Sequence, residues 1–147
     1  MTFSPASIAV AAIALATAIS PAMATPSMAP RYFAFEASGA PTRQPHEFIV
    51  EIDDPVTAAL AEDILLGHER STTRIRGIVI KGRTDYNESW PFHLDPTSIR
   101  FFSNSTEVCD ASSLYVEENL SRVGTGFLPD HEWCPWSTRL TREVKYP

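Results

Sequence analysis

Aromatic side chains are concentrated in one stretch of this sequence, residues 85–102. All three tryptophans of the chain lie in or beside segments predicted to be loops, and two of them flank Cys134-Pro135. Aromatic rings on anchored loops stack on sugar rings or contact protein partners over a large area at little entropic cost. The sequence therefore predicts a binding surface for a protein or carbohydrate ligand. Its predicted members are Tyr86, Asn87, Trp90, His93, Trp133 and Trp136.

The same tryptophans have a structural alternative. Trp133 and Trp136 lie on either side of Cys134, where they would bury a disulfide as a small apolar core. Under this alternative the indole rings are buried, and their mutation unfolds the protein instead of removing binding.

Signatures of catalysis are weak in the sequence. It contains no Gly-x-Ser-x-Gly elbow, His-Glu-x-x-His pair, P-loop or Gly-x-Gly-x-x-Gly motif. Paired carboxylates could serve a glycosidase, and the candidates are Glu107, Asp110, Glu117 and Glu118. We expect a non-catalytic domain, and a small hydrolase using His or carboxylate residues is the alternative.

A metal site would draw on His93 and Asp95 from one side of a strand, with His131 and Glu132 from a later loop. A histidine between two apolar strand residues is more typical of a ring that hydrogen-bonds a neighbour. The chain has only two cysteines, which excludes a cysteine-rich zinc site. We therefore expect neither a metal nor a cofactor.

Cys109 and Cys134 are predicted to form a disulfide, because two cysteines in an exported chain usually pair. A closed loop of this length stabilises a fold by roughly 3–4 kcal/mol on the chain-entropy model. The alternatives are a free catalytic thiol and a half metal site. Residues 127–136 would then form a loop anchored by the disulfide, which raises the further alternative of a secreted protease inhibitor.

Residues 1–24 have the features of a secretory signal. An apolar run from Ile8 to Ile19 ends at the helix breaker Pro21 and is followed by the small-x-small sequence Ala22-Met23-Ala24. The run is shorter than the roughly 20 residues that span a bilayer. We therefore expect a secreted, extracellular protein with no membrane association once the signal is removed.

The charge balance points the same way. The chain carries 12 basic and 18 acidic residues, a net charge of −6, and the predicted signal contains no ionisable side chain. An acidic surface argues against nucleic acid and against anionic membranes as partners.

Local patterns place the first elements. Strands are predicted at 32–36 and 48–52, the second from strict alternation of apolar residues. Asp54 is a predicted N-cap followed by Pro55 at the first helical position, and Gly67 is a typical C-terminal stop. A helix is therefore predicted over 55–66.

The second half continues with a strand at 73–81 and strands at 90–94 and 98–102, joined by a corner at Asp95-Pro96. Asn104 is a predicted cap for a second helix that ends near residue 120. The last strand covers 138–146. Arg142 lies on its apolar side and is expected to pair with Glu107 or Asp110.

This order predicts one α+β domain in which two helices cover one antiparallel sheet. The arrangement is the ferredoxin-like βαββαβ order with an extra N-terminal edge strand. We expect residues 1–24 to be the signal, 25–45 a lead-in with the edge strand, and 46–147 the disulfide-bonded domain.

The chain also resembles an uncharacterised family of small secreted microbial domains, over roughly residues 46–143. The resemblance implies a single exported domain and implies no catalytic residue. It is carried by Tyr86-Asn87, Trp90, Phe92-His93-Leu94-Asp95-Pro96, Ile99, Phe101-Phe102, Glu107-Val108-Cys109-Asp110-Ala111 and Trp133-Cys134-Pro135-Trp136-Ser137, with Phe48, Asp54-Pro55, Ile64-Leu65 and Gly77 to Gly82.

Overall fold

The structure is a computed structural model, and it describes residues 29–37, 47–104 and 107–146. The predicted signal at 1–24 and the predicted loop at 38–46 lie outside the described residues. No helix within the described ranges is long and apolar enough to cross a membrane.

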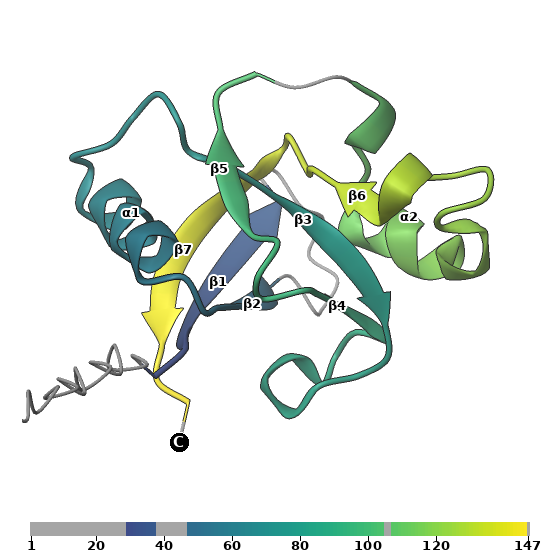
Figure 1. Cartoon of the computed structure of the whole chain (residues 1–147), viewed down its shortest axis with the longest axis horizontal. Helices are drawn as coiled ribbons and strands as arrows, with labels where there is room; N and C mark the ends of the chain where they lie inside the picture. The colour runs from purple at the N-terminus through teal and green to yellow at the C-terminus, as the bar shows by residue number, and fades with distance from the viewer. Residues whose placement is uncertain (1–28, 38–46, 105–106, 147) are drawn as a thin grey trace, which may run out of the picture.

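One sheet joins the two ends of the described chain. Strand β1 (Arg31–Ala37) lies between β2 (Glu47–Ile52) and β7 (Thr138–Val144), and both pairings are antiparallel (Figure 1). Along β2 the buried residues alternate, with Phe48, Val50 and Ile52 facing the core as their spacing predicted. The strand predicted at 32–36 is therefore the centre of a sheet and not its edge.

The second sheet is built on β3 (Arg74–Lys81). Three short strands pair with it antiparallel along its length: β4 (Phe92–Leu94), β5 (Arg100–Phe102) and β6 (Glu132–Trp133). The corner between β4 and β5 is confirmed, because the main-chain N–H of Ser98 donates to the carbonyl oxygen of Asp95 over 2.9 Å.

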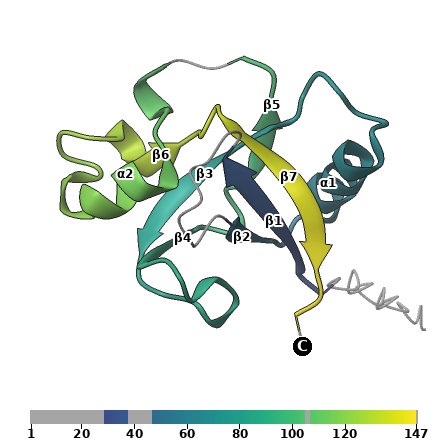
Figure 2. The same ribbon diagram turned by 180° about the vertical axis from the view of Figure 1, so that it is seen from behind.

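The two sheets face each other across an aromatic core. Phe48 of β2 lies 5.0 Å from Phe92 of β4 and 5.2 Å from Trp133 of β6, measured between ring centroids. Helices α1 (Pro55–Leu66) and α2 (Ser113–Glu118) lie on opposite sides of this assembly (Figures 1 and 2). The chain is therefore a small α+β domain with two antiparallel sheets, and the ferredoxin-like single sheet covered by two helices is not confirmed.

Helix α1 forms as predicted. The carboxylate of Asp54 accepts hydrogen bonds from the main-chain N–H of Thr57 over 2.9 Å and from its hydroxyl over 2.6 Å. Pro55 occupies the first turn, and Gly67 ends the helix with a left-handed φ of 75°. These bonds lower the pKa of Asp54, with the hydroxyl bond from Thr57 as the largest cause.

The second helix is shorter than predicted. A single turn, η2 (Glu107–Cys109), is followed by a break, and α2 begins only after Ser112, whose hydroxyl accepts from the N–H of Tyr115. The disulfide explains the break. The carbonyl oxygen of Cys109 accepts from the N–H of Cys134 over 2.8 Å and is therefore turned toward β6 and away from a following helical turn.

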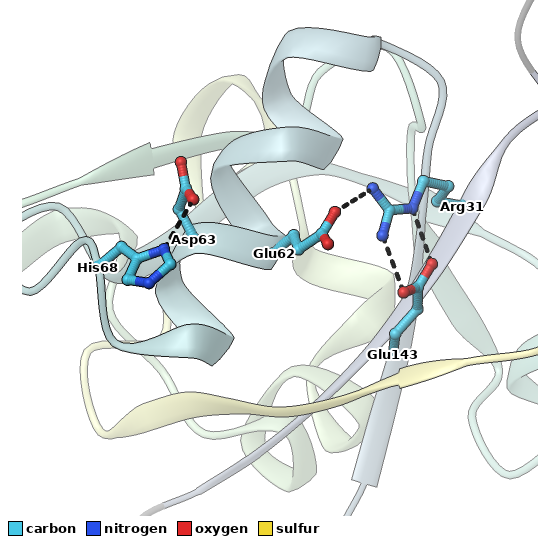
Figure 3. Close-up of polar contacts among 5 residues, drawn as sticks. All are labelled: Arg31, Glu62, Asp63, His68 and Glu143. Atoms are coloured by element: carbon cyan, nitrogen blue, oxygen red, sulfur yellow. Dashed lines mark hydrogen bonds and ion pairs between the residues drawn. The ribbon is translucent and has the colours of Figure 1, made fainter.

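Ion pairs fasten α1 and the ends of the chain to the first sheet. The guanidinium of Arg31 bonds Glu143 of β7 at 2.7 Å and Glu62 of α1 at 3.0 Å, while His68 approaches Asp63 separately (Figure 3). Arg142 pairs with Glu47 on β2 at 2.7 Å. The expected partners of Arg142, Glu107 and Asp110, were wrong because β7 lies beside β1 and close to β2.

The cap of α1 gives the first prediction. Asp54→Ala should lower the melting temperature by roughly 3–8 °C, because the N–H of Thr57 loses its acceptor. The stabilisation by Asp54 should also disappear as pH falls through its lowered pKa. Thermal melts followed by circular dichroism measure both effects. Asp53→Ala, which removes the exposed neighbouring carboxylate, is the control, and an unchanged melting temperature for Asp54→Ala would contradict the prediction.

Candidate functional site

The structure does not bring the six predicted binding residues together on one surface. Trp90 and Trp133 are 2% and 0% exposed, so neither indole is available to a ligand. Both rings pack against Phe48. The structural alternative, in which these tryptophans are buried, describes both of them.

Each buried indole has a hydrogen-bond partner. The Nε1–H of Trp90 donates to the carbonyl oxygen of Glu47, and that of Trp133 donates to the carbonyl oxygen of Ala111, both over 2.8 Å. These bonds satisfy the polar end of each ring inside the core. Trp90 and Trp133 therefore connect the loops that carry them to β2 and to the start of α2.

Asn87 is also buried and has a positioning role. Its side-chain carbonyl accepts from the N–H of Ile49 over 3.0 Å, and its amide donates to the carbonyl oxygen of Phe92 over 3.3 Å. The short helix η1 (Asp85–Asn87) is thereby held between β2 and β4.

His93 and Trp136 are both half-buried and have separate surroundings. The Nδ1 of His93 lies 3.0 Å from the carbonyl oxygen of Gly82, which is a strand residue bonding a neighbour. Trp136 packs against Phe102 beside the disulfide and lies under the guanidinium of Arg74 at 5.0 Å. Of the three tryptophans, Trp136 is the one that covers the disulfide.

The Cys109–Cys134 disulfide is confirmed. The two Cα atoms lie 5.2 Å apart, and the residues are 2% and 0% exposed. The carboxylate of Asp110 accepts from the N–H of Trp136 over 3.0 Å and holds the late loop at the same point. The disulfide is therefore a buried structural link.

The residues considered for metal binding have other partners. The carboxylate of Asp95 accepts from the hydroxyl and N–H of Thr97, and Glu132 pairs with Arg76 at 3.3 Å. Among the residues that the structure describes, no group of three His, Cys, Asp or Glu side chains is placed to hold a metal ion.

Tyr86 belongs instead to a cluster of three tyrosines at one edge of the molecule. Its ring centroid lies 5.2 Å from that of Tyr32 on β1 and 6.2 Å from that of Tyr146, which follows β7; Tyr32 and Tyr146 are 5.1 Å apart. Tyr86 is buried, Tyr32 is half-buried and Tyr146 is 39% exposed. We call Tyr32, Tyr86 and Tyr146 the tyrosine cluster.

A carboxylate lies within the tyrosine cluster. The hydroxyl of Tyr32 donates to Oε1 of Glu51 over 3.3 Å, and the two residues are register partners on β1 and β2. Burial raises the pKa of Tyr86 to about 12, and the charge of Glu51 adds to the shift. The pKa of Tyr32 is raised by the same two causes. The phenols are therefore neutral donors at physiological pH.

Sequence reasoning missed two of the three tyrosines. Tyr32 and Tyr146 stand near opposite ends of the chain, and their proximity depends on the pairing of the first and last strands. The signal available in the sequence was limited to the amphipathic pattern of those strands, which marks the face of a residue but not its neighbours.

The fold and the site together describe a small disulfide-bonded α+β domain with an aromatic core and a tyrosine-rich edge. The family model described as the BP-74 N-terminal domain matches residues 29–147, and the chain belongs to this family. Neither the curated proteins nor the solved structures gave a match.

Removing a core indole tests its structural role. Trp90→Ala should lower the free energy of unfolding by about 3–5 kcal/mol, because a large cavity opens beside Phe48 and the carbonyl oxygen of Glu47 loses its donor. Trp136→Ala should cost less, since that ring is only half-buried. Urea unfolding of both variants measures the difference. Equal costs would show that Trp90 is not held as the structure has it.

The raised pKa of Tyr86 predicts a loss of stability in alkali. Unfolded Tyr86 ionises near pH 10 and folded Tyr86 near 12, so its contribution is complete below pH 10 and disappears as pH rises toward 12. Tyr86→Phe should make stability less dependent on pH in this window. Denaturant midpoints measured across it provide the test, and an identical pH profile for the variant and the wild type would overturn the assignment.

Proposed function

We propose that this chain is a secreted, non-catalytic binding domain whose contact surface is the tyrosine cluster. The observation that carries the proposal is the meeting of three tyrosine rings with Glu51 at one edge of the molecule. The proposal keeps Tyr86 from the surface predicted by sequence, and it replaces the two core tryptophans by Tyr32 and Tyr146.

The composition of the tyrosine cluster supports a role in recognition. Tyrosine combines an apolar ring with a hydroxyl, and its two side-chain torsions cost little entropy to fix on binding. Here the rings already contact one another, so the most exposed ring, Tyr146, is supported from behind by Tyr32 and Tyr86. A partner would therefore meet a surface that is ordered in advance.

Export is the second part of the proposal. Its support is the apolar segment and cleavage sequence within residues 1–24, together with the Cys109–Cys134 disulfide, which is characteristic of oxidising compartments. The secreted microbial character implied by the motifs in residues 46–143 belongs to the same proposal.

The hydrolase alternative has less support. The carboxyl groups with a shifted pKa in the described chain include Glu47 and Glu143, whose pKa values are lowered first by hydrogen bonds from Arg142 and Arg31. A general acid needs a raised pKa so that it is protonated at working pH. These two carboxylates instead act as anchors between strands.

The protease-inhibitor alternative depends on the shape of the late loop. A substrate-like inhibitor presents an extended segment that pairs with the protease as an added strand. In this loop Leu128, Asp130 and His131 have positive φ angles of 46°, 58° and 62°, which coil the segment before Trp133. The conformation favours a structural role for the loop.

Binding through the tyrosine cluster can be tested on arrays of peptides and glycans. The wild-type chain should bind at least one probe above background, and Tyr146→Ser should remove most of that binding because it deletes the most exposed ring of the cluster. Tyr115→Ser is the matched control, because Tyr115 is 48% exposed on α2 and outside the cluster. Thermal melts verify that both variants fold. No binding to any probe, or equal loss in both variants, would overturn the proposal.

A further inference from the structure

The edge of the molecule that carries the tyrosine cluster also carries unpaired negative charge. Glu51 bonds the hydroxyl of Tyr32, Asp85 lies in η1, and Asp53 and Glu88 are close enough to act on the cluster electrostatically. Within the described ranges, none of these four carboxylates forms an ion pair. The edge therefore has four acidic groups whose charge is not neutralised by a contact.

Other parts of the same sheet are neutralised. Glu47 is paired with Arg142 and Glu143 with Arg31, each at 2.7 Å. The basic residue nearest in sequence to the acidic groups of η1 is Arg83, and its guanidinium bonds the main-chain carbonyl oxygen of Glu88 instead of a carboxylate. The charge is thus balanced within the sheet and left in excess beside the tyrosines.

This chain already stacks guanidinium groups on aromatic rings elsewhere. The guanidinium carbon of Arg31 lies 5.3 Å from the ring centroid of Phe33, and that of Arg74 lies 5.0 Å from Trp136. A cation within about 6 Å of an aromatic face is attracted by the ring quadrupole. Tyr146, with a ring 39% exposed, has no such cation among the described residues.

The chemistry of the cluster favours an organic cation over a metal ion. A divalent metal requires several charged oxygen ligands at one point, whereas the phenols here are neutral. Burial holds the pKa of Tyr32 and Tyr86 above the usual value, so these hydroxyls do not ionise to serve as ligands at physiological pH. A planar guanidinium can instead stack on a phenol ring and donate N–H groups to a carboxylate beside it.

We propose that the tyrosine cluster and its four carboxylates bind an arginine side chain in a basic peptide segment of a partner protein. The inference rests on the proposed function and names the chemistry of its partner. Arginine stacks on the outer ring of Tyr146, and the acidic groups, above all Glu51, attract the basic residues around it.

Titration calorimetry with synthetic peptides tests the proposal on the full chain with its disulfide formed. The probes are a glycine-rich peptide with several arginines and the same peptide with glutamate in their place. Only the arginine peptide should bind, and binding should weaken as salt rises from about 50 to 500 mM. Tyr146→Ser and Glu51→Gln should each weaken binding by about 2-fold to 30-fold, the range of one cation–π or charge contact.

Matched variants separate this surface from the rest of an acidic protein. Tyr115→Ser removes the fourth tyrosine, and Glu117→Gln neutralises an exposed acid on α2, so both should bind like the wild type. Equal weakening in these controls would mean non-specific attraction and would overturn the proposal. Equal affinity for the arginine and glutamate peptides, or none for either, would also overturn it.

The two proposals fail differently. If Tyr146→Ser abolishes binding to a neutral glycan while arginine peptides do not bind, the tyrosine cluster is a recognition surface and the cationic partner is wrong. If the cluster variants bind every probe as the wild type does, both proposals fail.

Discussion

Aromatic packing between the two sheets around Phe48 is the interaction on which the rest of the structure depends. Its ring contacts Phe35 within its own sheet and Trp90, Phe92 and Trp133 across the interface. Three of these rings come from segments that pair with β3 or follow it closely, so one side chain of β2 collects distant parts of the chain. Such large rings bury much apolar surface per residue, which suits a domain of this size.

The same packing determines which aromatic residues are left at the surface. Trp90 enters the core, and Asn87 fixes the preceding turn to β2 and β4 through two main-chain hydrogen bonds. With the turn held in this way, Tyr86 lies against Tyr32 and Tyr146. The candidate binding surface is therefore a consequence of the core, because the residues that bury Trp90 also place Tyr86.

Charge is distributed unevenly over the first sheet. Arg31 and Arg142 connect β1, β2, β7 and α1 through ion pairs, so basic residues are used for cohesion between these elements. Glu51, on the strand next to β1, accepts a phenol hydroxyl and has no basic partner among the described residues. The net charge of −6 is thus expressed most clearly where the tyrosines gather.

Local features were determined by the sequence itself. Asp54, Pro55 and Gly67 define α1 at both ends because capping depends on residues within one turn. Alternation in β2 identified its buried face, and the two cysteines identified the disulfide because no other thiol was present.

Only the tertiary structure decided which strands are neighbours. Alternation shows which face of a strand is apolar, and that face fits several partners equally well; the pairing of β1 with β7 therefore could not be deduced. The expected partner of Arg142 was wrong for this reason, and Tyr32 and Tyr146 went unrecognised as neighbours of Tyr86. The burial of Trp90 likewise depends on Phe48, a residue distant in sequence, because an aromatic ring suits a core and a binding surface equally.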